Sequence, residues 1–496
     1  MSSRASSARP RSKKLVLAVI DSLKPEQLDR AVAAGRAPTL AKLLEHGTYV
    51  RDCVSTFPSV TPVAAATIAT GVGPDEHRIP SMNWYHRGEE RYVEYGSSFP
   101  ATRAHGVFRS LFDTVYNMNM AHLARGTKTV FEHLDDAGLR TAGTTYLIYR
   151  GRHRHEPSGA SMYRRVAEAA QFRHPVWGPE EFFYADLFDS RDTGCTASLG
   201  MPGQRDRHSA CVGAHLVEND LFDFLLFSLP DNDTFSHRYG PAESVQSIAG
   251  ADRALEQLME PAGGPDEFLS EHAVVVMSDH SQTPVEARVN LADVLSPWRL
   301  LAPADVAPDE AEVAICPAAR SAMVYALDPN SRERTTADLV EDLSDVDGID
   351  LVCWRLDGEA ALRSSKGELR FAPGGDLEDG RGGTWSVEGS TAALGLRTED
   401  GRVRSGAYPD ALGRLWSALS CVQSGNVLLS AKPGYEFVDW GGADHVPGGS
   451  HGSLHADDSE GVLIMCGVGP DSAEQRPDWS LRDVTPMILE HFGVPS

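Results

Sequence analysis

The stretch Leu15-Val16-Leu17-Ala18-Val19-Ile20-Asp21 places six apolar residues directly before a carboxylate. The pattern recurs in residues 273–279, which end on Asp279, and in residues 223–233, where an apolar run leads into Asp231 and Asp233. Continuous β-branched and aliphatic runs predict strands that are buried on both faces of a parallel sheet. Because ligands bind at the carboxyl ends of such strands, we expect these acids to share one crevice. The predicted fold class is α/β with a mostly parallel central sheet.

The length and composition of the chain allow a large core. It has 496 residues, of which 41% are hydrophobic, so we expect one α/β domain with a substantial insertion, or two domains. Acidic and Gly-rich stretches, such as residues 373–383, and short alternating strand candidates characterise the expected insertion. The predicted division is a disordered basic tail (1–12), the first part of the core (13–285), an inserted smaller α+β cap region (286–440) and the last part of the core (441–496).

Local patterns predict the helices and strands of the core. Apolar spacing and a following glycine predict a helix over residues 38–46. Pro62 suits the first position of a second helix, with Thr61 as its N-cap and Gly71 at its end. The remaining predicted elements are strands at 48–50, about 140–149 and 461–467, and helices at 129–138 and 486–492.

The charge of the chain excludes some classes of partner. A formal net charge of −24 disfavours binding to nucleic-acid duplexes and to anionic membranes, because the long-range field repels polyanions. A small phosphorylated substrate is still compatible, since bound metal ions outweigh that field at contact distance. The sequence gives no indication of the oligomeric state.

The N-terminus and the cysteines suggest a cytoplasmic protein. Basic residues precede the apolar run 15–20, but this run is shorter than the apolar part of a secretion signal. No apolar stretch approaches the roughly 20 residues of a membrane span. The seven cysteines are odd in number and have no CxxC spacing, so we expect mostly free thiols in a reducing compartment.

Several side chains at the expected crevice are metal-ligand types. Asp233 and His237 are four residues apart, so on a helix they face the same side. Asp279 and His280 follow a predicted strand, and His451 lies in a glycine-rich loop that would allow close approach to a metal. Mixed carboxylate and imidazole ligation without cysteine favours zinc, with manganese or iron as alternatives.

Thr61 is the candidate nucleophile. A helix N-terminus and a bound dication would both favour its alkoxide. Taken alone, a threonine before a proline is more often only a helix cap. The acids expected around it favour the catalytic interpretation.

These motifs resemble the type I phosphodiesterase/nucleotide pyrophosphatase family of the alkaline phosphatase superfamily. The matching segments keep the order of the family over about residues 14–285 and 440–496: 19–21, 37–47, 57–61, 70–71 with 76–77, 230–241, 277–280 and 449–452. The resemblance implies an alkaline-phosphatase-like three-layer α/β/α core and two divalent metal ions. It implies Asp21, Asp279 and His280 as ligands of one ion, and Asp233, His237 and His451 as ligands of the other. It further implies Thr61 as the nucleophile, in contact with the metals, and Asn83 as a contact to a non-bridging phosphate oxygen.

The sequence departs from the family pattern in two places. The usual histidine-glycine-isoleucine turn is His77-Arg78-Ile79 here, and Asp231 competes with Asp233 as a ligand. We favour Asp233 because only it has the four-residue spacing to His237.

Other polar and aromatic residues have weaker functional signals. The basic segment 150–155 is interpreted as a solvated loop, and His445 and His455 as ordinary loop histidines. Trp84 and Tyr85 could equally stack on a substrate or close the core.

The expected activity, by this resemblance, is two-metal-dependent hydrolysis of phosphate esters, of the phosphodiesterase or nucleotide pyrophosphatase type, through a phospho-threonine intermediate. The alternatives are a phosphomonoesterase, a phosphonoacetate-type carbon–phosphorus hydrolase and, in another class, a catalytically silent binding protein of the same fold. The motifs do not distinguish the substrates.

Overall fold

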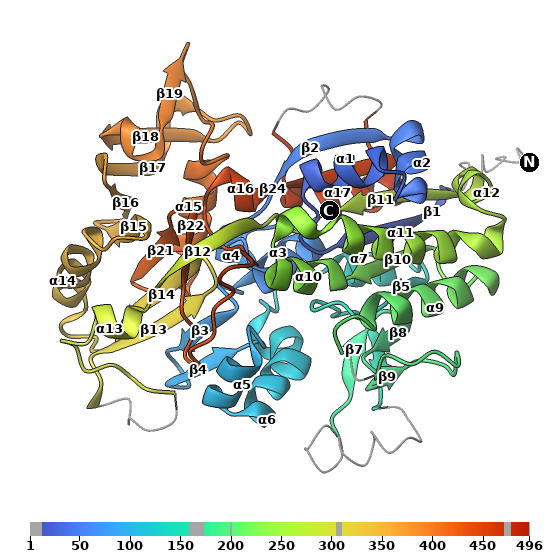
Figure 1. Cartoon of the computed structure of the whole chain (residues 1–496), viewed down its shortest axis with the longest axis horizontal. Coiled ribbons are helices and arrows are strands. Elements are labelled where there is room, and N and C mark those ends of the chain that lie inside the picture. Colours follow the sequence, from blue (N-terminus) through green and yellow to red (C-terminus); the bar gives the residue numbers. More distant parts are fainter. Residues whose placement is uncertain (1–11, 158–172, 199–200, 304–309, 471–477, 496) are drawn as a thin grey trace, which may run out of the picture.

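The protein is built on a large, mostly parallel sheet (Figure 1). The computed structural model describes residues 12–157, 173–198, 201–303, 310–470 and 478–495. The strand order is β2-β24-β11-β1-β10-β5-β8-β9, and the five strands from β11 to β8 are parallel, as the sequence predicts. The bounds are β1 (Lys14–Ile20), β2 (Thr48–Val54), β5 (Thr141–Gly143), β8 (Glu181–Tyr184), β9 (Phe188–Asp189), β10 (Phe224–Leu229), β11 (His272–Met277) and β24 (Glu460–Cys466).

The two faces of this sheet are covered by separate layers of helices. Alternate residues of β1 enter two hydrophobic clusters: Leu15 and Leu17 one, Val16 and Ala18 the other. One face packs against α1 (Pro25–Ala33), α2 (Pro38–His46), α9 (Arg205–Glu218), α11 (Val245–Met259) and α12 (Pro265–Glu271). The other packs against α3 (Thr61–Thr70), α7 (Val130–Asp136) and α17 (Val484–Phe492). This arrangement is the expected three-layer α/β/α core.

The expected local elements are found with small shifts. The helix at 38–46 has the predicted bounds. Helix α3 begins one residue earlier than predicted, so that Val60 is the N-cap and Thr61 is the first helical residue. It ends at Gly71, whose φ of 76° lies in the left-handed region that favours glycine. The strand expected over 140–149 is confined to β5, and the strand expected at 461–467 runs antiparallel to β11.

A second, nine-stranded sheet occupies most of the segment expected to be an insertion (Figure 1, yellow to orange). Helix α14 (Arg332–Ser344) packs against one face and α15 (Ala411–Ser420) against the other. The sequence of this segment indicates only short strand candidates, which the structure joins into one large sheet. Its strands are β13 (Val313–Ala318), β14 (Ser321–Ala326), β15 (Ile349–Leu356), β16 (Glu359–Ser364), β17 (Gly367–Glu378), β18 (Thr384–Gly389), β19 (Leu396–Glu399), β20 (Arg402–Ser405) and β21 (Val427–Ala431).

A small three-stranded sheet is formed by segments that connect the two large sheets along the chain. It consists of β12 (Thr283–Val289), β22 (Gly434–Phe437) and β23 (Gly449–Ser450). Strand β12 runs through residue 285, where the sequence predicts a boundary. Nearby, fully buried Arg320 forms an ion pair with fully buried Asp458, which joins the turn after β13 to α16 (Ala456–Ser459). The predicted domain boundaries stay a proposal.

Some sequence-based interpretations need correction. Cys195 and Cys211 form a disulfide, whereas the other five cysteines are free and buried, so the expectation of free thiols is wrong for this pair. Arg150 is not solvated: it is buried and forms an ion pair with Glu132, with 3.0 Å between Nη2 and Oε2. Trp84 and Tyr85 are core residues.

Residues 1–11 of the predicted basic tail lie outside the described part. No described helix has the length and apolar character needed to cross a bilayer.

Candidate active site

The candidate site residues converge at the carboxyl edge of the parallel strands. Asp21 follows β1, and Asp279 and His280 follow β11. Helix α10 (Asp231–Tyr239) follows β10 and carries Asp233 and His237. Thr61 opens α3, and His451 directly follows β23. Segments far apart in the sequence meet here because parallel strands end at one edge of the sheet.

The first group of ligand atoms comes from Asp21, Asp279 and His280. One ligand atom from each lies within 4.8 Å of the other two. His280 Nε2 is 3.7 Å from Asp21 Oδ1 and 3.4 Å from Asp279 Oδ2. Asp279 is oriented by the backbone N–H groups of Ser22 and His280, which donate to its Oδ1 at 3.2 and 3.0 Å.

The second group comes from Asp233, His237 and His451. Asp233 Oδ1 lies 3.4 Å from His237 Nε2 and 3.7 Å from His451 Nε2, and the two Nε2 atoms are 3.2 Å apart. Ligand atoms of Asp233, His280 and His451 also lie within 4.8 Å of one another, so His280 lies between the two groups.

Hydrogen bonds to the imidazole rings leave their Nε2 atoms available. His237 Nδ1 lies 2.8 Å from the carbonyl of Gly449, and His451 Nδ1 lies 2.8 Å from the carbonyl of Ser59. Because a carbonyl only accepts, each Nδ1 carries the proton, and Nε2 of the neutral ring presents a lone pair to the centre of the site. This tautomer is the one that a metal ligand needs.

The electrostatics of the site reflect acids and imidazoles that are buried close together. Burial, followed by the charges of Asp279 and Asp233, raises the pKa of Asp21 well above its ordinary value. Burial raises the pKa of Asp279 to about 6. Burial also lowers the pKa of His237 to about 3 and that of His451 to about 4, so both rings are neutral. Asp233 differs: burial raises its pKa, but the adjacent histidines outweigh this and lower it overall.

These residues therefore fit divalent cations. The Oδ1 atom of Asp21 is buried and has no hydrogen-bond partner among the described residues, although it faces the other ligand types. A buried carboxylate oxygen without a partner is costly unless a cation or proton meets it. Three carboxylates and three neutral imidazoles form the donor set expected of a zinc or manganese site.

Thr61 lies against this cluster. Its Oγ1 is 3.2 Å from His280 Nε2, at the N-terminus of α3. The positive end of the helix dipole and the adjacent ligand groups act on the same hydroxyl. The arrangement is suited to nucleophilic attack.

Two polar residues that the sequence analysis did not single out hold Asp233. Ser22 Oγ donates to Asp233 Oδ1 at 2.7 Å, and Gln282 Nε2 donates to the same oxygen at 2.6 Å. Ser22 has a φ of 58°, a left-handed conformation that the turn after β1 requires. Their positions next to Asp21 and His280 were the only available signal in the sequence.

His445 also lies at the site, contrary to the interpretation as an ordinary loop histidine. Its ring stacks on that of His237, with 3.9 Å between centroids, and its Nδ1 bonds the buried Glu436 at 2.9 Å. Burial lowers the pKa of His445, but the hydrogen bond and charge of Glu436 produce a net rise. His455, in contrast, accepts a hydrogen bond from the backbone of Asp457 at the start of α16.

The site opens into a cavity of about 580 Å³. Asp21, Thr61, Asp233, Asp279 and His451 line it together with an apolar and aromatic wall formed by Met82, Tyr95, Phe99, Tyr146, Leu147 and Phe437. Arg205 is the one arginine among the described lining residues, and none of them is a lysine.

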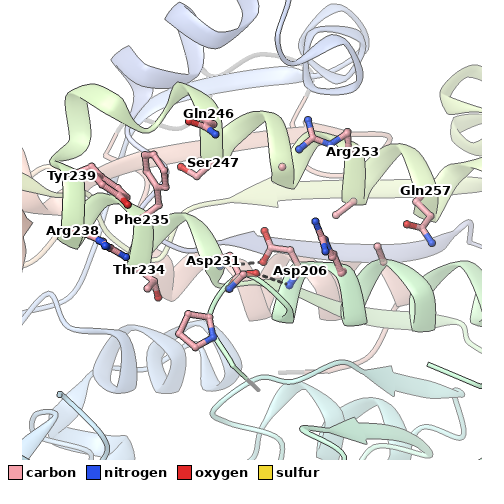
Figure 2. A pocket seen from close by; sticks show the side chains of 16 residues that line it. Asp206, Asp231, Thr234, Phe235, Arg238, Tyr239, Gln246, Ser247, Arg253 and Gln257 are labelled. Carbon is pink, nitrogen blue, oxygen red and sulfur yellow. Dashed lines mark hydrogen bonds between the residues drawn. The ribbon is translucent and has the colours of Figure 1, made fainter. Parts of the chain in front are cut away.

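Asp231 lies on the other side of α10. It lines a separate cavity of about 810 Å³ between α9, α10 and α11, where it faces Asp206 (Figure 2). Its Oδ1 accepts from Arg205 Nε at 2.9 Å, and its Oδ2 accepts from the backbone N–H of Asp206 at 3.1 Å. These bonds engage both carboxylate oxygens of Asp231 and join α10 to α9.

Asn83 is not among the residues that line the catalytic cavity. It lies on β3 (Asn83–His86), where its Nδ2 contacts Val93 O at 3.2 Å, Glu94 Oε2 at 3.0 Å and His105 Nε2 at 3.3 Å. A role in holding phosphate stays a prediction for this residue.

Solved structures similar to this one span nearly its whole length. Phosphonoacetate hydrolase from Sinorhizobium meliloti 1021, in complex with phosphonoformate, is 18% identical with a TM-score of 0.54, covering 98% of this chain and 96% of that chain. Human ectonucleotide pyrophosphatase/phosphodiesterase 5 is 11% identical with a TM-score of 0.58, covering 98% and 96%. An inactive threonine-to-alanine variant of the murine protein, in complex with AMP, is 9% identical with a TM-score of 0.57, covering 97% and 96%.

The comparison with curated proteins found no match. The family model of type I phosphodiesterase/nucleotide pyrophosphatase matches residues 15–454. This span includes both groups of candidate ligands and Thr61. The chain therefore belongs to the type I phosphodiesterase/nucleotide pyrophosphatase family, whose members hydrolyse phosphoric esters.

Proposed function

We propose that this protein is a two-metal-dependent phosphodiesterase or nucleotide pyrophosphatase that acts through a phospho-threonine intermediate. The observation that carries the proposal is the position of Thr61 Oγ1, 3.2 Å from His280 Nε2, where the two groups of ligand atoms meet. The inactive threonine-to-alanine variant of the murine relative supports a catalytic threonine in this fold.

Each ion would have its own set of ligands. Asp21, Asp279 and His280 would hold one, and Asp233, His237 and His451 the other, with zinc favoured and manganese as the alternative. Bound there, the ions would supply positive charge that favours the Thr61 alkoxide and offsets the charge of the phosphoryl group.

The reaction proceeds in two displacements at phosphorus. The Thr61 oxygen, having lost its proton to solvent, attacks phosphorus, and the ester oxygen departs and takes up a proton. Water then attacks phospho-Thr61, which breaks the new bond and releases the phosphorylated product and the free hydroxyl. The positive end of the α3 dipole lies at Thr61, where it favours the negative charge that develops in both steps.

The second candidate is a phosphonoacetate-type carbon–phosphorus hydrolase, which one of the similar structures favours. Its substrate carries a carboxylate that needs a cationic partner. Arg205 is already bonded to Asp231, to Thr234 Oγ1 at 2.6 Å and to the carbonyl of Pro230. The aromatic and apolar wall of the cavity suits an uncharged leaving group better, which favours phosphodiesters.

Initial rates on bis-p-nitrophenyl phosphate, p-nitrophenyl phosphate and phosphonoacetate test this proposal. We expect the diester to have the highest kcat/KM, EDTA to abolish turnover, and zinc or manganese to restore it. A higher kcat/KM on phosphonoacetate or on the monoester would move the assignment to that alternative. Full turnover in a chelated, metal-free sample would refute the two-metal mechanism, and a metal-loaded protein inactive on all esters would indicate a silent binding protein.

A further inference from the structure

Tyr146 carries a buried hydroxyl that nothing in the described structure satisfies. The residue lines the catalytic cavity with Asp21 and Asp279, and only 6% of it is exposed. Its hydroxyl oxygen is shielded from water and has no hydrogen-bond partner among the described residues. Native proteins rarely leave such a group unpaired, so its partner is expected to arrive with a ligand.

Tyr146 lines the same cavity as the acids of the first ligand group, Asp21 and Asp279. Burial raises the pKa of Tyr146, and the charges of Asp279 and Asp21 raise it further. Asp21 Oδ1 is likewise shielded and unpartnered. Two residues that line one cavity therefore each carry an unsatisfied polar atom, one an acceptor and one a donor, as expected where a cation and an anionic group bind together.

The backbone on both sides of Tyr146 is fixed. Before it, the N–H of Thr144 donates to Leu226 O at 3.1 Å, and Thr144 Oγ1 accepts from Ser228 N at 2.9 Å. After it, Asn119 Nδ2 donates to the carbonyl of Leu147 at 2.8 Å. The residue is therefore positioned before any ligand binds, which is what electrostatic stabilisation of a transition state requires.

Asn83, which the sequence predicts as a contact to a non-bridging phosphate oxygen, forms other hydrogen bonds. Asn83 Nδ2 has three acceptors within 3.3 Å, from Val93, Glu94 and His105. Its two N–H groups are thus used inside the protein, and Asn83 does not line the cavity. In this arrangement Asn83 offers no free N–H group to the cavity, whereas Tyr146 lines it.

We propose that the Tyr146 hydroxyl donates a hydrogen bond to a non-bridging oxygen of the phosphoryl group while Thr61 attacks phosphorus. This assignment rests on the proposed phosphoester hydrolysis. The bond strengthens as charge builds on the non-bridging oxygens, so Tyr146 stabilises the transition state more than the bound substrate. No bond to Tyr146 is made or broken.

Replacing Tyr146 with phenylalanine tests the assignment, because it removes one oxygen and keeps the ring. We expect Tyr146→Phe to lower kcat/KM on bis-p-nitrophenyl phosphate about 10- to 100-fold, mainly through kcat, and to weaken inhibition by orthovanadate by a similar factor. Metal content and Tm should equal those of the parent. The matched control is Tyr149→Phe, whose buried hydroxyl donates to Val115 O outside the cavity. It should alter stability but neither turnover nor orthovanadate inhibition.

The outcomes separate this inference from the proposed function. If the parent hydrolyses the diester and metal-loaded Tyr146→Phe matches it in kcat/KM and vanadate inhibition, Tyr146 is not the donor, although the hydrolase proposal stands. If the parent hydrolyses no ester, the hydrolase proposal fails, and calorimetric binding of orthovanadate to the zinc-loaded proteins decides. Equal affinities for parent and Tyr146→Phe would then overturn the assignment, whereas weaker binding by the variant would support the contact.

Discussion

At the scale of single residues, substitutions of Thr61 show whether this threonine is the nucleophile or only a structural residue of α3. We expect Thr61→Ala to retain its metal and lower kcat by several orders of magnitude, because the attacking oxygen is lost. A structural role alone would affect stability and leave turnover of the folded protein intact, because Thr61 is the first residue of α3. Thr61→Ser keeps a hydroxyl and should retain measurable activity. Thr70→Ala at the other end of α3, where Oγ1 donates to Ala66 O, serves as the control and should stay active. Folded, metal-loaded Thr61→Ala with parental activity would mean that water attacks directly.

At the scale of elements, α10 separates two environments. Asp233 and His237 face the catalytic cavity, whereas Asp231 lines the other one, where it faces Asp206 (Figure 2). Asp231 also bonds Arg205. We expect Asp233→Ala to lose about one metal ion per chain and nearly all activity, and Asp231→Ala to keep most of both. Metal analysis and initial rates measure the two effects. The opposite ranking would make Asp231 the ligand.

The junction of α9 and α10 makes stability depend on pH. Burial, and then the charge of Asp231, raises the pKa of Asp206 to about 7, above its value of about 3.9 in an unfolded chain. Folding therefore retains a proton on this carboxyl, and its destabilising effect grows as the pH rises from about 4 to about 7. Asp206→Asn should raise Tm by a few degrees at pH 8 and leave it unchanged at pH 4, as thermal unfolding would show. The exposed Asp338→Asn is the control, and an equal gain at both pH values would contradict this origin.

At the scale of the whole molecule, the ligand groups connect segments that are distant in the chain. Asp21, Asp233, Asp279 and His451 follow four different strands. A cation that binds only this folded arrangement stabilises it by about 2.7 kcal/mol at 100 times its Kd. We expect EDTA to lower Tm by several degrees and zinc to restore it. Asp233→Ala should respond much less to zinc, and an identical zinc response in parent and variant would place the metal elsewhere.

The sequence by itself determined the core elements and the composition of the site. Apolar runs such as residues 15–20 can only be buried on both faces, and a polar residue after each run must lie at the edge of the sheet. These are local properties, so strands β1, β10 and β11 and helix α2 were predictable to within a few residues. The same local properties predict that Asp21, Asp233 and Asp279 lie at one edge of the sheet.

Only the tertiary structure decided what depends on partners far away in the chain. The antiparallel pairing of β24, the extent of the second sheet and the pairing of Cys195 with Cys211 leave no local pattern. The direction of a side chain has the same origin: Glu94 and His105 turn Asn83 into the protein, and Glu436 holds His445 against His237. Periodicity fixes which face a residue occupies, but hydrogen bonds and packing across the fold fix what its side chain meets.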